Sequence, residues 1–207
     1  MTGVAAGSRK RAFTLMELVV TMGLVTILAG AAAYAVTQNR NQVQVARSTS
    51  NLRAEVERVR ALSRTAGSRL GTARLNYGAG CALGAGNLLW ININPGANTV
   101  TLPRAIQYDP ATDLLNVTCA NWNFGGFSGA QGEASFAFPP NPTTFGFSAN
   151  GRLAFPDGAA PVDMYVQLQH DDATFVSKGF RVLPSGVICI SAMSNPVPSP
   201  CDEEVRP

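Results

Sequence analysis

A single carboxylate, Glu17, stands inside an otherwise uncharged apolar stretch near the start of the chain. The stretch runs from Phe13 to Val36, which is 24 residues. As an α-helix it would be roughly 36 Å long, enough to cross a hydrocarbon core of about 30 Å. A charge inside such a span costs about 2.5–3.5 kcal/mol at the centre and less near the ends. Glu17 is therefore expected to have a charged partner and a function.

The partner that the sequence offers Glu17 is an α-amino group. No cation lies within the apolar stretch, whereas three consecutive cations (residues 9–11) and the small Ala12 come directly before it. Cleavage between Ala12 and Phe13 would create a new amine four residues before the carboxylate. The chemistry predicted for this end of the chain is therefore proteolytic processing, followed by an ion pair in apolar surroundings.

Residues 10–20, Lys-Arg-Ala-Phe-Thr-Leu-Met-Glu-Leu-Val-Val, resemble the class III signal of type IV prepilins and type II secretion pseudopilins. The resemblance implies that a prepilin peptidase cuts between Ala12 and Phe13 and methylates the new amine of Phe13. It also implies that Glu17 of one subunit pairs with this amine on a neighbouring pilin subunit. The sequence departs from the family at Ala12, where a glycine is usual.

An ordinary secretory signal peptide is the alternative interpretation of the same stretch. Ala33-Tyr34-Ala35 offers a small-x-small cleavage site, which would release a soluble β-rich protein beginning at Val36. The apolar run is long for such a signal, and Glu17 would have no role in it. The prepilin interpretation is therefore preferred.

The charge of the chain changes when the leader is removed. The 207 residues include 16 basic and 13 acidic side chains, a net charge of +3. Residues 1–12 hold three of the basic side chains and no acidic one, so the processed product has 13 of each. A basic leader before a membrane span predicts a cytoplasmic N-terminus, a single pass through the inner membrane and an exported C-terminal body.

Four cysteines lie in the predicted exported part: Cys81, Cys119, Cys189 and Cys201. An even number in an oxidising compartment favours disulfides, and four cysteines allow three connectivities. Cys189 and Cys201 are close in sequence and form the first choice of pair, which leaves Cys81 with Cys119. Free thiols are the alternative. No Cys-x-x-Cys spacing occurs and there is one histidine, so we expect no zinc site.

Other residues that could take part in catalysis or bind a metal have simpler explanations. His170, Asp171 and Asp172 suit a polar turn between two strands better than a catalytic group. Asp109 and Asp113 carry oxygen ligands that calcium could use, but they form no recognised calcium loop. The sequence has no nucleophile elbow, phosphate loop or nucleotide fingerprint. We predict a protein that is not an enzyme and needs no metal or cofactor.

Arginine is concentrated in one segment, because residues 40–74 contain eight arginines and two glutamates. One interpretation is a basic surface for DNA, with Arg64, Arg69 and Arg74 as the contacts and natural transformation as the function. The other is a solvated helix face that meets acidic neighbours. The spacing does not place all eight arginines on one face, and no aromatic residues alternate with them. The DNA interpretation is the second choice.

Hydrophobic periodicity predicts the elements that position these residues. Leu52, Val56, Val59, Leu62 and Ala66 form one helical stripe, and Gly67 is the expected stop. The predicted organisation is a leader (1–12), a transmembrane and assembly helix (13–36), its amphipathic continuation (37–70) and an exported β-rich body with a Pro-rich tail (71–207). Strands with period two are expected at residues 73–77, 88–94, 99–106, 114–118, 135–138, 144–148, 152–155, 163–169, 174–183 and 187–191.

The C-terminal strands extend the resemblance. Residues 145–152 (Phe-Gly-Phe-Ser-Ala-Asn-Gly-Arg) and 180–187 (Phe-Arg-Val-Leu-Pro-Ser-Gly-Val) resemble the H-type minor pseudopilins and FimT-like minor pilins. Asn150-Gly151 suits a type I′ hairpin, and Ser185-Gly186 another hairpin. Val187 stands where DNA-binding relatives carry arginine. The resemblance implies an α+β pilin-like fold, with a long N-terminal helix packed on an antiparallel β-sheet body, in a minor subunit of a pilus, competence pilus or type II secretion pseudopilus.

Overall fold

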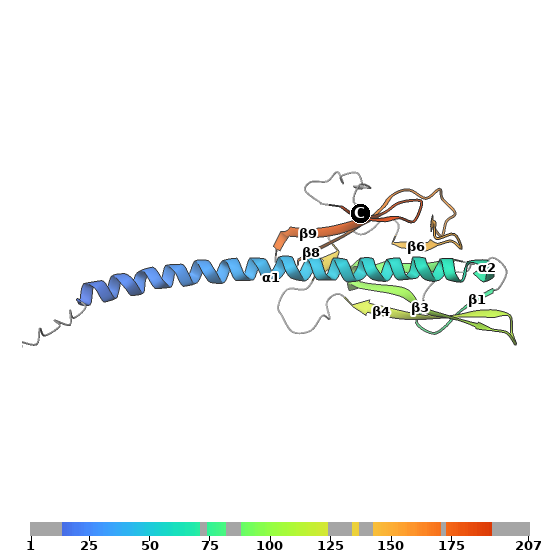
Figure 1. Cartoon of the computed structure of the whole chain (residues 1–207), viewed down its shortest axis with the longest axis horizontal. Coiled ribbons are helices and arrows are strands. Elements are labelled where there is room, and N and C mark those ends of the chain that lie inside the picture. The colour runs from blue at the N-terminus through green and yellow to red at the C-terminus, as the bar shows by residue number, and fades with distance from the viewer. Residues whose placement is uncertain are drawn as a thin grey trace, which may run out of the picture. The chain divides into compact units, whose positions relative to one another are not determined.

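A computed structural model describes residues 14–70, 74–81, 88–123, 134–136, 143–170 and 173–191. The chain divides into two compact units, residues 1–40 and residues 41–207. Helix α1 (Leu15–Thr65) contributes to both units. The elements are labelled in Figure 1.

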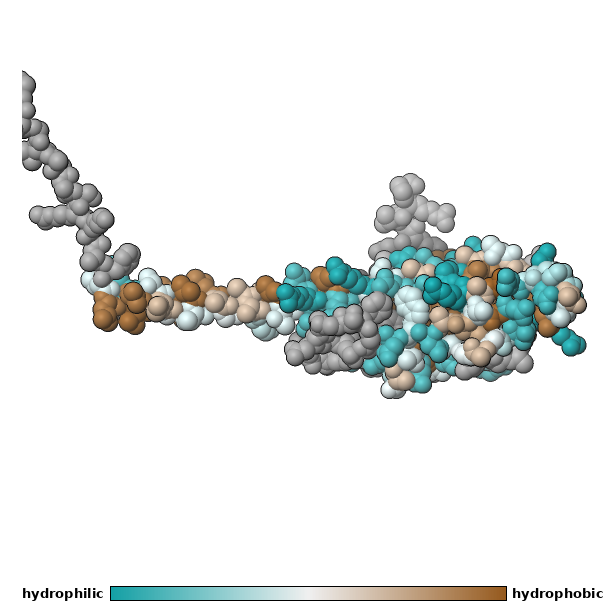
Figure 2. Space-filling view, turned by 90° about the horizontal axis from the view of Figure 1, so that it is seen from below, coloured by the Kyte–Doolittle hydropathy of each residue, from teal (hydrophilic) through white to brown (hydrophobic). Residues whose placement is uncertain are grey.

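The described part of the first unit is the beginning of α1. Every residue from 14 to 40 is exposed, and hydrophobic side chains gather along this part of the helix (Figure 2). An 18-residue window of α1 has a mean hydropathy of 2.0. Among the described residues, this one helix is long and apolar enough to cross a membrane.

The later part of α1 packs into the second unit through the predicted stripe. Leu52, Val56 and Val59 are each at most 1% exposed. The buried stripe begins earlier than predicted, at Val45, and it includes Thr49, whose hydroxyl donates to the Val45 carbonyl oxygen at 2.8 Å. The sequence pattern missed this first turn because hydroxyl side chains interrupt the apolar series there.

The helix ends at Thr65, and a short helix, α2 (Gly67–Leu70), follows it. The sequence predicted that the helix stops at Gly67. In the structure α1 ends two residues earlier, and Gly67 is the first residue of α2. A Cβ added at Gly67 would lie 2.8 Å from the carbonyl oxygen of Ala149. Glycine is needed here for the close approach of two backbone segments.

Two sheets complete the second unit. The first has the strand order β1-β4-β3-β2-β6-β7 and the second β10-β9-β8-β5. The strands of the first sheet are β1 (Arg74–Tyr77), β2 (Leu89–Asn94), β3 (Thr99–Asp109), β4 (Leu114–Asn123), β6 (Thr144–Phe147) and β7 (Leu153–Ala154), and a 3-10 turn, η1 (Pro95–Ala97), joins β2 to β3. Those of the second sheet are β5 (Ala134–Phe136), β8 (Met164–His170), β9 (Ala173–Val182) and β10 (Ile188–Ser191).

Each of these strands overlaps a predicted one, but β3 and β4 extend three and five residues further than expected, to Asp109 and Asn123. The α+β fold with a long helix on a sheet body is confirmed. One pairing differs from the expected antiparallel body, because β1 runs parallel to β4. Cys81, just beyond β1, is bonded to Cys119 of β4 and holds the two segments side by side. The pairing of β3 with β4 shifts register between Pro103 and Ala105, consistent with a proline that has no N–H for the ladder.

One hydrophobic core joins the body part of α1 to both sheets. Its largest fully buried side chains include Phe145 and Phe147 of β6 and Phe180 of β9. Phe145 and Phe147 belong to the first resembling segment, and Phe180 to the second. The aromatic residues of both motifs are thus core residues.

Candidate functional site

Glu17 closes the first turn of α1. Its Oε2 accepts a hydrogen bond from the backbone N–H of Thr14 at 3.1 Å and another from the Thr14 hydroxyl at 3.2 Å. The backbone N–H of Glu17 in turn donates to the Thr14 hydroxyl oxygen at 3.3 Å. This reciprocal arrangement is a capping box, which satisfies N–H groups that a helix start leaves without partners.

The capping box explains how a carboxylate is tolerated at this position. A helix N-terminus carries a partial positive charge that favours an anion, and two donors of Thr14 point at one carboxylate oxygen. The Thr-x-x-Glu pattern was present in the sequence and would have identified Thr14. Ala12 and Phe13, the predicted cleavage pair, lie outside the described residues.

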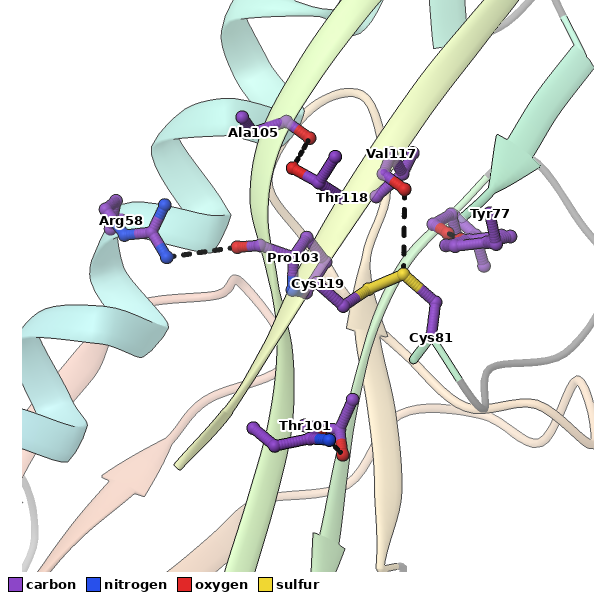
Figure 3. Close-up of a disulfide and its surroundings, with 11 residues drawn as sticks. Arg58, Tyr77, Cys81, Thr101, Pro103, Ala105, Val117, Thr118 and Cys119 are labelled. Carbon is purple, nitrogen blue, oxygen red and sulfur yellow. Dashed lines mark hydrogen bonds between the residues drawn. A yellow bond between two sulfur atoms is a disulfide. The ribbon is translucent and has the colours of Figure 1, made fainter. Parts of the chain in front are cut away.

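A disulfide joins Cys81 to Cys119, with the two Cα atoms 5.3 Å apart (Figure 3). It links two residues that are 38 positions apart in the chain. Cys189 is also disulfide-bonded. Cys201, its predicted partner, lies outside the described residues.

Tyr77 lies beside this disulfide, as Figure 3 shows. Its hydroxyl donates to the carbonyl oxygen of Leu88. Burial disfavours the charged phenolate and raises the pKa of Tyr77 to about 12. The half-buried phenol therefore links the end of β1 to Leu88, the residue before β2.

Two arginines of α1 donate to backbone carbonyls of the body. Arg58 donates to the carbonyl oxygen of Arg104 at 2.5 Å. It also donates to the carbonyl oxygen of Pro103 at 3.1 Å (Figure 3). Both acceptors lie at the irregularity of β3. Arg58 therefore supplies donors to carbonyl groups at the point where the strand ladder is disturbed.

Arg60 connects two glycine turns, one from each sheet. Its Nε donates to the Gly151 carbonyl at 3.2 Å, and an Nη donates to the Ser185 carbonyl at 3.5 Å. Gly151 and Gly186 have φ values of 72° and 80°. A Cβ added at Gly186 would overlap the carbonyl oxygen of Gly151. The two motifs that resemble minor pilins thus meet at their glycines. Partial burial lowers the pKa of the Arg60 guanidinium.

The hairpin turn at Gly151 differs from the prediction. A type I′ turn needs positive φ at both Asn150 and Gly151, but Asn150 is not among the positive-φ residues of the described chain. The Gly151 N–H instead donates to the Ser148 carbonyl at 2.7 Å. The loop is therefore a turn over Ala149 and Asn150 followed by a left-handed glycine, a geometry that brings Gly151 against Gly186.

The three arginines predicted as DNA contacts lie on three different elements: α1, α2 and β1. Arg64 packs on the first glycine turn, because a Cβ at Gly151 would lie 2.5 Å from its Nε. Arg69 lies over the ring of Tyr108, at 4.2 Å from the centroid. Arg74 is exposed at the start of β1. The structure thus engages Arg64 and Arg69 in contacts within their own chain.

The acidic candidates lie in the β3–β4 hairpin. Asp109 accepts hydrogen bonds from the Thr112 hydroxyl at 2.7 Å and the Ala111 N–H at 2.9 Å, which lower its pKa. Asp113 accepts from the Tyr108 hydroxyl at 3.0 Å. Within the described ranges no group of three metal-binding side chains gathers. His170 ends β8, and Asp171 and Asp172 lie outside the described residues.

Comparison with known proteins bears on the N-terminal region. Residues 7–33 match the family model described as the prokaryotic N-terminal methylation motif. No curated protein and no solved structure matches the chain. The matched residues contain Ala12, Phe13, the capping box and most of the apolar stretch. The chain therefore carries a prepilin-type N-terminal methylation motif at the start of a long apolar helix, and in both respects it fits a type IV pilin-like protein.

Proposed function

We propose that this protein is a minor pilin or pseudopilin, a structural subunit of a type IV pilus or type II secretion pseudopilus. The observation that carries the proposal is the methylation motif of residues 7–33, with Glu17 held at the first turn of the apolar helix. The apolar stretch from Phe13 to Val36 supplies packing area, and Glu17 supplies the one charge within it. The protein acts through assembly, not catalysis.

The proposed sequence begins with the precursor anchored in the inner membrane, its leader in the cytoplasm and its body exported. Prepilin peptidase then cleaves between Ala12 and Phe13 and methylates the new amine of Phe13. Glu17 of one subunit pairs with this amine on a neighbour, which neutralises two charges that are costly in apolar surroundings. The pair fixes the axial register of the two subunits.

Two features of the body support its export and its structural role. The disulfide between Cys81 and Cys119 suits an oxidising compartment. Arg58, Arg60, Arg64 and Arg69 contact their own chain, which gives the arginine-rich segment a role in holding the body together. A DNA-uptake function has weaker support, because Val187 also stands where DNA-binding relatives carry arginine.

The proposal is tested by separating the charge of Glu17 from its capping role. Glutamine can replace glutamate in a capping box, so Glu17→Gln keeps the helix start and loses the charge. We expect both Glu17→Gln and Glu17→Ala to insert into the membrane normally. Both are expected to be incorporated into filaments at least tenfold less than the wild type, as measured by immunoblotting of sheared filaments.

Thr14→Ala is the matched control, since it weakens the same capping box and keeps the carboxylate. This variant is expected to assemble better than Glu17→Gln. Normal incorporation of Glu17→Gln would show that the charge has no role in assembly. If Thr14→Ala assembled as poorly as Glu17→Gln, the helix cap alone would explain the effect.

A further inference from the structure

Two turns of the body, at Asn150-Gly151 and Asp157-Gly158, have the same local geometry. The glycine φ values are 72° and 71°. In each turn the glycine N–H donates to the carbonyl oxygen three residues earlier, at 2.7 Å in the first turn and 3.2 Å in the second. The residue before each glycine is exposed. Any difference in reactivity between the two turns must therefore come from their surroundings.

The surroundings of the two glycines differ. Gly151 is buried. Its carbonyl oxygen accepts a hydrogen bond from Arg60, and a Cβ added to it would lie 2.5 Å from Nε of Arg64. The backbone of Gly186 lies against the same carbonyl oxygen. We call this set of contacts the glycine junction. Gly158, in contrast, is exposed, and a Cβ added there would meet nothing within 4 Å.

An asparagine followed by glycine can deamidate, because glycine has no side chain to hinder attack by its own backbone nitrogen. In this reaction the Gly151 nitrogen attacks Cγ of Asn150, and the new N–C bond closes a succinimide ring. The bond from Cγ to the side-chain amide nitrogen breaks, and this nitrogen leaves as ammonia with the proton of the Gly151 N–H. Water then opens the ring and leaves aspartate or isoaspartate at position 150.

We propose that Asn150 is a latent deamidation site, which the glycine junction keeps unreactive in the folded body. The attacking nitrogen has to give up its hydrogen bond to Ser148 and turn toward the Asn150 side chain. That movement needs space that Arg64 and Gly186 occupy. Reaction therefore requires local opening of the junction, and its rate follows the fraction of molecules in which the junction is open.

Modification of Asn150 would change the joint between the two sheets. Isoaspartate adds one carbon atom to the main chain. The Gly151 carbonyl oxygen already lies so close to Gly186 that a single Cβ does not fit between them. A lengthened main chain would separate these segments and the hydrogen bonds of Arg60, so the junction would not close again. The junction thus sets the chemical lifetime of the body, whether or not the chain assembles into a filament.

The test uses the full chain in detergent micelles with the substitution Asp157→Asn, which puts a second asparagine before a glycine in the open turn. Peptide mapping by mass spectrometry follows both positions at mildly alkaline pH. We expect Asn150 to deamidate at least about tenfold more slowly than position 157, because it must wait for local opening. In concentrated urea, which removes the junction, the two rates should become similar.

A second pair of variants tests the junction itself. Arg60→Met is expected to speed up deamidation of Asn150 about three- to tenfold, the effect of losing hydrogen bonds to two carbonyl groups. Arg53→Met is the matched control, since the Arg53–Glu57 pair is exposed on the same helix, and it should leave the rate unchanged.

Two results would overturn the proposal. One is equal deamidation at the two positions in the folded chain. The other is an unchanged rate at Asn150 in folded Arg60→Met. If Arg60→Met did not fold, the comparison of the two turns within the Asp157→Asn chain would decide the question alone.

Discussion

Glu17 caps the helix start in the structure, and the proposed function gives it a second role in assembly. Its carboxylate oxygen caps the start of α1 through Thr14, which gives a structural reason for a charge near the end of an apolar span. The next residue before Thr14 is Phe13, whose amine the predicted cleavage would free. The carboxylate at the helix start is thus four residues from the amine that the proposed cleavage would free.

Tyr77 provides a test at the scale of one residue. Burial raises its pKa to about 12, above the value near 10 of an unfolded chain. A group whose pKa is raised by folding stabilises the folded state below the unfolded pKa. That stabilisation is lost as the pH rises from about 10 through 12. We expect one of the four tyrosines to ionise with an apparent pKa near 12 in an absorbance titration.

Replacing Tyr77 with phenylalanine should remove this last ionisation step. The variant should also lose less stability than the wild type between pH 10 and 12, measured by urea unfolding. The prediction fails if the alkaline titration and the pH dependence of unfolding are the same in both proteins.

At the scale of elements, the disulfide between Cys81 and Cys119 ties the parallel strand β1 to β4. A loop of 38 residues gives an entropic stabilisation of about 4 kcal/mol on the chain-entropy model. Replacing both cysteines by serine is expected to lower the free energy of unfolding by up to about this amount. Calorimetry and urea unfolding of the body would measure it, and a loss below about 1 kcal/mol would contradict a stabilising role.

Arg60 joins one turn from each sheet to α1. Arg60→Met would remove the donors to Gly151 and Ser185, and we expect it to cost about 1–3 kcal/mol of unfolding free energy. Arg53→Met is the matched control, since the Arg53–Glu57 pair is exposed on the same helix and should be worth less than about 1 kcal/mol. Equal losses in urea unfolding of the two variants would contradict the contribution of Arg60 to joining the sheets.

The elements themselves were predictable from local patterns. Alternating apolar residues and turn glycines mark the strands, and the four- and three-residue steps of Leu52, Val56 and Val59 mark the buried helix face. Apart from the bond between Cys81 and Cys119, contacts between distant segments were not predictable. The parallel pairing of β1, the turn at Gly151 and the tie through Arg60 all depend on which segments meet in space, and spacing along the chain carries no such information.

At the scale of the whole molecule, the arginine-rich segment and the leader have separate roles. Removing residues 1–12 brings the side-chain charge from +3 to zero, so the processed chain has no excess positive charge to attract DNA over long distances. Contacts of Arg60 and Arg64 with the glycine turns, and of Arg69 with Tyr108, instead tie the arginine-rich segment to the body. These observations together favour a structural subunit.

The central claim is that the chain is processed as a prepilin, and intact-mass measurement with N-terminal sequencing of the mature protein tests it most directly. The expected product begins at Phe13 and is heavier than the unmodified fragment by one methyl group. Deletion of the prepilin peptidase should leave the full-length precursor. A mature protein that begins at Val36, as cleavage after Ala33-Tyr34-Ala35 would give, would contradict the claim.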